Sequence, residues 1–124
     1  MSKYEHPYVE HADYLEYVVH GSVRDEDLLA DLLQSMVEAT EKTGKRRVLV
    51  DRTDSGDEAI TDTMVIYRLA VRVGEAFGSS VRIAALSARA DQHSFWEDVA
   101  SNRGAIVKAG NDRESLMQWL LSDE

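Results

Sequence analysis

Hydrophobic and polar residues form short blocks along the 124-residue chain, and the clearest block lies near its middle. Val48, Leu49 and Val50 follow one another without a polar interruption, and such a run is typical of a strand buried on both faces of a sheet. We therefore predict a strand over residues 46–51. Gly44 precedes it and can end a helix, because glycine adopts the left-handed conformation at little cost. Asp51 closes the strand, at the position where open α/β sheets usually meet ligands or partners.

The remaining elements follow from the spacing of apolar residues. Spacings of three and four residues predict helices, and short apolar or alternating runs predict strands. The predicted helices cover residues 25–43, 60–77 and 91–102, followed by a last helix capped by Asn111 or Asp112. The other predicted strands cover residues 4–10, 14–20, 81–86 and 105–109. In the last helix, four residues are expected to face the core: Leu116, Trp119, Leu120 and Leu121.

The order of these elements predicts one α/β domain over residues 1–124. The first two strands are joined by a connection of hairpin length, so they should pair antiparallel at an edge of the sheet. The later strands alternate with helices, which requires right-handed crossovers and parallel pairing. We therefore expect a five-stranded mixed sheet in the order ββαβαβαβα, with helices packed on it.

Composition excludes several classes of function. The chain has no cysteine, which removes disulfides, thiolate metal sites and thiol catalysis. The formal net charge of −9 disfavours binding to nucleic acid or to anionic lipid surfaces. No apolar run approaches the length of a membrane helix and the first residues have no signal core, so we expect a cytoplasmic protein. Lys45, Arg46 and Arg47 form a tight basic cluster, which we interpret as a solvated helix-to-strand turn.

The element order and its landmarks resemble the STAS superfamily, named for sulfate transporters and anti-sigma-factor antagonists. The resemblance covers residues 14–121 and is strongest to the stand-alone, anti-sigma-factor-antagonist-like bacterial branch, which is also compared with CRAL-TRIO lipid-transfer domains. Arg24 and Gly110 depart from that branch, where threonine and an aromatic residue are common. The landmarks are Gly21, Val23, Asp27-Leu28, Val48-Leu49-Val50-Asp51, Arg82-Ile83-Ala84, the segment 95–104 and Trp119-Leu120.

This resemblance implies a non-enzymatic, protein-binding module that phosphorylation switches. Family members carry a phosphorylated serine at the start of the second helix, about ten residues after the central strand. Here Thr61 stands ten residues after Asp51, with Thr63 nearby, so we expect modification or partner contact at these residues. Ser55, in Asp-Ser-Gly, comes too early and is typical of a turn. A helix N-cap is the structural alternative for Thr61.

Three other interpretations stay open. The main one is a carrier or sensor of a small apolar, lipid-like ligand held between sheet and helices, as in CRAL-TRIO domains. Asp51, Ser87 and Lys108 follow the last three strands as in response-regulator receivers, but the acidic pair that would complete a Mg²⁺ site is missing. An enzyme ranks third, after the binding module and the carrier, because no nucleophile elbow, phosphate loop or dinucleotide motif occurs. We predict no catalytic residue, metal site or cofactor.

We also predict a homodimer, formed through the helix over residues 60–77. Its apolar arc is wider than one sheet face needs, and Val65 falls on the polar side among Arg68 and Arg72. Sedimentation equilibrium should show a dimer that Val65→Glu breaks, because the glutamate would bury an unpaired charge. The alternative is a singly exposed valine in a monomer. A wild-type monomer at micromolar concentration contradicts the prediction, as does a dimer that tolerates the substitution.

Overall fold

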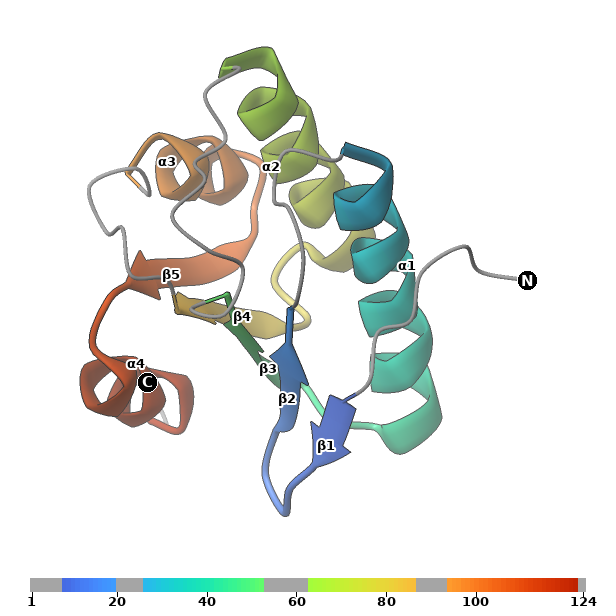
Figure 1. Ribbon diagram of the computed structural model, residues 1–124, viewed down its shortest axis with the longest axis vertical. Helices are drawn as coiled ribbons and strands as arrows, with labels where there is room; N and C mark the ends of the chain where they lie inside the picture. The colour runs from blue at the N-terminus through green and yellow to red at the C-terminus, as the bar shows by residue number, and fades with distance from the viewer. Residues whose placement is uncertain (1–7, 20–25, 53–62, 87–93, 123–124) are drawn as a thin grey trace.

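The computed structural model describes residues 8–19, 26–52, 63–86 and 94–122, and within them the predicted α/β order is confirmed (Figure 1). Residues 4–7 of the first predicted strand, and residue 20 of the second, lie outside the described residues. The elements are β1 (Tyr8–Glu10), β2 (Leu15–Val18), α1 (Glu26–Thr43), β3 (Arg47–Asp51), α2 (Thr63–Phe77), β4 (Arg82–Leu86), α3 (Ser94–Asn102), β5 (Ile106–Gly110) and α4 (Arg113–Leu120).

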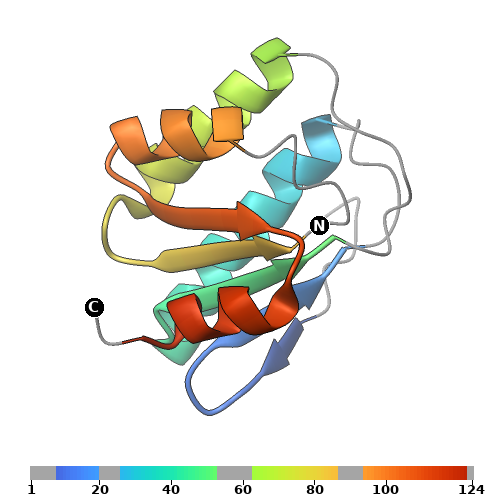
Figure 2. The same ribbon diagram turned by 90° about the vertical axis from the view of Figure 1, so that its left-hand side faces the viewer.

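The five strands form one sheet in the order β1-β2-β3-β4-β5. As predicted, β1 pairs antiparallel with β2, and the other pairs are parallel. Each crossover moves one strand in the same direction, so right-handed connections place α1, α2 and α3 on one face of the sheet. The last helix, α4, covers the other face (Figure 2). Because the strand order never reverses, the sheet lacks the switch point at which doubly wound folds bind ligands.

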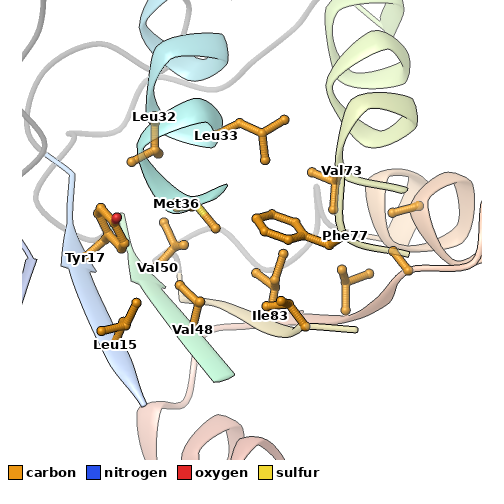
Figure 3. Close-up of a cluster of buried hydrophobic side chains, with 14 of the residues drawn as sticks. Leu15, Tyr17, Leu32, Leu33, Met36, Val48, Val50, Val73, Phe77 and Ile83 are labelled. Atoms are coloured by element: carbon orange, nitrogen blue, oxygen red, sulfur yellow. The ribbon is translucent and has the colours of Figure 1, made fainter. Parts of the chain in front are cut away.

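The central strand β3 supplies side chains to both layers. Val48 and Val50 point into the larger cluster, beneath α1 and α2, where Met36 and Phe77 contact them (Figure 3). Leu49 points into the smaller cluster under α4. Val48 and Leu49 are 0% exposed and Val50 is 6% exposed, so the predicted burial on both faces is confirmed.

Tyr17 on β2 shows how a polar atom is accommodated in the larger cluster. Its side chain is fully buried, and its hydroxyl lies 3.2 Å from the Ser35 hydroxyl on α1. Burial raises the pKa of Tyr17, because the phenolate would lose its hydration. The Tyr8 ring on β1 packs against the same ring at a tilt of 35°, with centroids 5.2 Å apart, and so attaches the edge strand to the core.

The ends of two helices match their local sequence. Gly44 has a φ of 74° immediately after α1, where its N–H donates to the carbonyl of Thr40. Asp112 caps α4 by accepting a hydrogen bond from the N–H of Glu114. The hydroxyl of Ser115 donates to the same carboxylate and lowers the pKa of Asp112. Both helix-end assignments from the sequence are therefore confirmed.

One predicted core position on α4 is wrong. Leu116 and Leu120 are buried, but Leu121 is 39% exposed. Residues four apart share one face of a helix, whereas the residue after Leu120 lies about 100° further round the helix axis. The helix ends at Leu120, so Leu121 turns away from the sheet. Trp119 is half-buried and packs against the edge of the smaller cluster.

Replacing Leu49 with alanine should lower the free energy of unfolding by about 2–5 kcal/mol. The variant loses the transfer free energy of the removed methyl groups, and it leaves a cavity in the core. Val9→Ala is the matched control, since Val9 is 55% exposed on β1 and its truncation should change stability by less than about 0.5 kcal/mol. Urea unfolding followed by circular dichroism measures both. Equal midpoints for the two variants would refute the burial of β3 between two layers.

Candidate functional site

Asp51 is bound by an arginine from the last helix. It ends β3 at the carboxyl edge of the sheet and is 8% exposed. The Arg113 guanidinium, on the first residue of α4, donates from Nη2 to Oδ2 of Asp51 at 2.6 Å. This charge-assisted pair joins the central strand to the helix on the opposite face from α1 and α2. Asp51, which the sequence nominates as a partner-binding residue, thus lies within the structure's ionic framework.

The ion pair extends across the sheet to the turn between β1 and β2. Arg113 also donates from Nη1 to Oε2 of Glu16 on β2, at 3.2 Å. The other oxygen of Glu16 lies 2.9 Å from Nε2 of His11. A carboxylate only accepts, so Nε2 of His11 carries the proton. The His11 ring stacks on Tyr14 at a centroid distance of 4.4 Å. We call Asp51, Arg113, Glu16 and His11 the ionic cluster.

The contacts within the ionic cluster are those of a structural link between elements rather than of a reactive site. Arg113 donates hydrogen bonds to both carboxylates, and His11 is oriented by Glu16 and by Tyr14. In the receiver-like alternative, a lysine would face Asp51. The sheet register instead aligns Asp51 with Leu86 and Leu86 with Gly110, while Lys108 aligns with Ala84. Lys108 therefore stands two residues, about 7 Å, before the level of Asp51, and Ser87 lies outside the described residues.

The next residue, Arg52, places a positive charge at the same edge. Its N–H continues the sheet by donating to the carbonyl of Leu86 at 2.8 Å. Burial lowers the pKa of the Arg52 guanidinium, because the charged form loses hydration. Arginine nevertheless stays protonated in proteins at neutral pH. The carboxyl edge of β3 thus carries a buried carboxylate and a half-buried arginine in succession.

A second feature of this edge is an exposed apolar surface on α2. Met64 is 55% exposed and Tyr67 is 36% exposed, although both are large hydrophobic residues. Arg68 and Arg72 are exposed beside them. We call Met64, Tyr67, Arg68 and Arg72 the α2 surface. A methionine and a tyrosine flanked by arginines is the composition enriched in protein interfaces.

The α2 surface is held in place by packing against α3. Gly74 lies so close to Arg103 that an added Cβ would stand 2.5 Å from the Cβ of Arg103 and 3.0 Å from its carbonyl oxygen. This contact brings the Arg103 guanidinium to the hydroxyl of Tyr67, to which Nη2 donates at 2.9 Å. This hydrogen bond orients the Tyr67 side chain, and a third arginine adjoins the surface.

A hollow of about 360 Å³ between α1 and α2 continues the α2 surface. Arg72 belongs to both. Apolar side chains form much of the hollow, and Gln34 and Glu75 add polar groups at its rim. The apolar lining comprises Ala30, Leu33, Val37 and Ala76.

The structure describes only some of the other residues that the sequence suggested as functional. Thr61 and Ser55 lie outside the described residues. Thr63 is the first residue of α2 and Val65 lies in its first turn, but the side chains of both also fall outside what is described. Arg68 and Arg72 are exposed, as the sequence predicted for the polar side of the helix. The homodimer and the phosphorylation therefore stay predictions.

Sequence reasoning missed the role of Arg113. It stands 97 residues from Glu16 and 62 from Asp51, so no local spacing connects the three. The position of Arg113, directly after the Asp112 cap, was the available signal, because a helix start following the last strand must lie near the carboxyl edge of the sheet.

No protein-family model matches the sequence, and a search of curated proteins finds no match either. Over the described ranges, no helix combines the length and the hydropathy needed to cross a membrane. The same ranges contain no grouping of three or more histidine or carboxylate side chains suited to a metal ion. The function is therefore argued from geometry and charge.

Replacing Arg113 with alanine should lower the free energy of unfolding by about 1–3 kcal/mol, because one buried and one largely buried carboxylate lose their shared cation. Glu114→Ala, at the neighbouring exposed position, is the control and should be near neutral. A double-mutant cycle with Asp51→Ala should give a coupling energy above about 0.5 kcal/mol. Strictly additive single effects would show that the 2.6 Å contact contributes nothing specific.

Proposed function

We propose that this chain is a non-enzymatic binding module that resembles the stand-alone STAS proteins and recognises a protein partner through the α2 surface. The observation that carries the proposal is the exposure of Met64 and Tyr67 on one face of α2, next to two exposed arginines. The element order ββαβαβαβα, with its antiparallel edge strand, supports the family resemblance.

The charge of the α2 surface indicates the chemistry of the partner. The chain as a whole carries a net charge of −9, yet Arg68 and Arg72 lie beside the exposed apolar residues, and Arg103 adjoins Tyr67. A surface of opposite sign to the rest of the protein favours a partner that presents apolar side chains flanked by carboxylates. The hollow between α1 and α2 offers space for one such apolar side chain.

Phosphorylation at the start of α2 would act directly on this surface. Thr63 is the first residue of the helix, and Thr61 precedes it by two residues. A phosphate there would add a charge of about −1.5 to −2 to the helix that carries Arg68 and Arg72. We therefore propose that modification at Thr61 or Thr63, in preference to Ser55, neutralises the arginines and releases an acidic partner.

A lipid carrier is the alternative function, and purification of the chain also tests it. A carrier of a small apolar ligand in the CRAL-TRIO manner would copurify with that ligand, which native mass spectrometry detects. In the described residues the layer between β3 and the three helices is occupied by side chains such as Val50, Met36 and Phe77 (Figure 3). This packing leads us to prefer the protein partner.

Met64→Glu should abolish capture of the partner by affinity purification from the native host, because it places a carboxylate opposite the acidic partner and removes an apolar anchor. The matched control is Val9→Glu, since Val9 and Met64 are both 55% exposed but lie on different elements. The same protein band should be retained by wild type and by Val9→Glu, and lost with Met64→Glu.

With the purified partner, Met64→Glu should weaken binding by at least about 30-fold, the range of an interface hot spot. Introducing glutamate at Thr61 should weaken it in the same direction. Retention of the partner by Met64→Glu, or equal losses with Met64→Glu and Val9→Glu, would refute the α2 surface as the binding site. An apolar ligand bound to the purified chain, with no protein captured, would establish the carrier instead.

A further inference from the structure

The opposite edge of the sheet, where the parallel strands begin, carries a concentrated positive charge. Arg47 is the first residue of β3, directly after Lys45 and Arg46, and Arg82 is the first residue of β4. In Figure 2 this is the edge from which the arrows of β3 and β4 start, away from the beginning of α2. A hollow of about 500 Å³ lies here, bounded by the turns β1–β2, α1–β3 and α2–β4.

The hollow has a surplus of positive charge that the helix ends do not cancel. Four basic residues and one acidic residue, Asp13, line it, which gives a formal charge of +3 within a chain of −9. Basic residues are also expected where helices end, because a helix carboxyl terminus carries about half a negative charge. All four helices that the structure describes, α1, α2, α3 and α4, end at this edge and together supply about −2. The surplus of cations therefore exceeds what helix capping explains.

Two of the cations that line the hollow are bonded to the last turn of α4 and to Ser122 just after it. Arg82 donates from Nη1 to the carbonyls of Trp119 and Ser122, both at 2.9 Å, and its guanidinium lies 5.3 Å from the Trp119 ring centroid. Arg47 donates from Nη2 to the same Ser122 carbonyl at 3.3 Å. Arg82 also donates from Nη1 to the Ser122 hydroxyl at 3.0 Å, so both guanidinium groups are held beside the end of the chain that the structure describes.

The other two cations occupy the rim in different ways. Lys45 is held over the hollow by a 2.8 Å bond from Nζ to the carbonyl of Ala12, with Glu10 at 3.8 Å. Arg46 is exposed, while its carbonyl is fixed by the N–H of Arg82 at 2.8 Å. The exposed Ser79 adds a hydroxyl to the opposite wall. A fixed backbone with an exposed guanidinium is a geometry suited to bidentate binding of an oxyanion.

We propose that this hollow is a binding site for a small phosphate-bearing molecule, with Arg46 as its principal contact and Lys45, Arg47 and Arg82 as supporting charges. The acidity of the remaining surface favours a small ligand over a nucleic acid or an anionic membrane, because extended polyanions would meet the negative charge around the hollow. The site is independent of the α2 surface, which lies at the other edge of the sheet.

The test is a titration of the full chain with inorganic pyrophosphate, followed by two-dimensional amide NMR. Saturating shifts are expected at residues 45–47 and 79–80. Arg46→Ala should weaken the affinity about tenfold, the loss of one charge-assisted contact. Arg68→Ala is the matched control, because it removes the same charge from an exposed position on α2 and should leave the affinity unchanged within about twofold.

The outcomes separate a site from general charge effects. Absence of saturable shifts at millimolar pyrophosphate would overturn the proposal, and so would equal weakening by the two alanine variants. Flotation with vesicles of phosphatidylcholine and phosphatidic acid distinguishes a lipid headgroup from a free phosphate. The proposal predicts that the chain stays unbound to these vesicles, and binding to vesicles without binding to pyrophosphate would contradict it.

Discussion

The burial of β3 on both faces is the constraint on which the rest of the molecule depends. A strand with Val48 and Val50 on one side and Leu49 on the other needs a hydrophobic layer over each face. Three helices supply the first layer, since successive right-handed crossovers in one direction all fall on the same side. The second layer must then come from the segment after the last strand. This requirement carries α4 across the sheet and brings Arg113 to Asp51.

Local periodicity was sufficient to predict the elements and the mixed sheet, because each helix or strand is specified by residues adjacent in the chain. The predicted end of α1 at Gly44 and the predicted start of α4 at the Asp112 cap were confirmed for the same reason. Contacts between distant segments were not predictable from spacing. Arg82 joins the Lys45-Arg46-Arg47 cluster through the sheet pairing of β3 with β4, so a cluster expected to be a solvated turn became the wall of a hollow.

The exposure of Met64 also has a geometric cause that the apolar pattern does not contain. A helix of 15 residues such as α2 is about 22 Å long, whereas a five-residue strand such as β3 spans about 17 Å. The first turn of α2 therefore extends past the edge of the sheet, as Figure 1 shows. An apolar residue there has no sheet beneath it. Hydrophobic spacing predicts which side of a helix faces the core but not how far that core extends.

The two edges of the sheet consequently carry different chemistry. At the carboxyl edge Arg113 binds the carboxylates of Asp51 and Glu16, and the α2 surface is an accessible feature among the residues that the structure describes there. The central claim is that a partner covers this surface, and hydroxyl-radical footprinting with mass spectrometry tests it most directly. Oxidation of Met64 and Tyr67 should fall severalfold when the captured partner is added, while oxidation of Trp119 on α4 should stay constant. Unchanged labelling of Met64 and Tyr67 in a saturated complex would contradict the account.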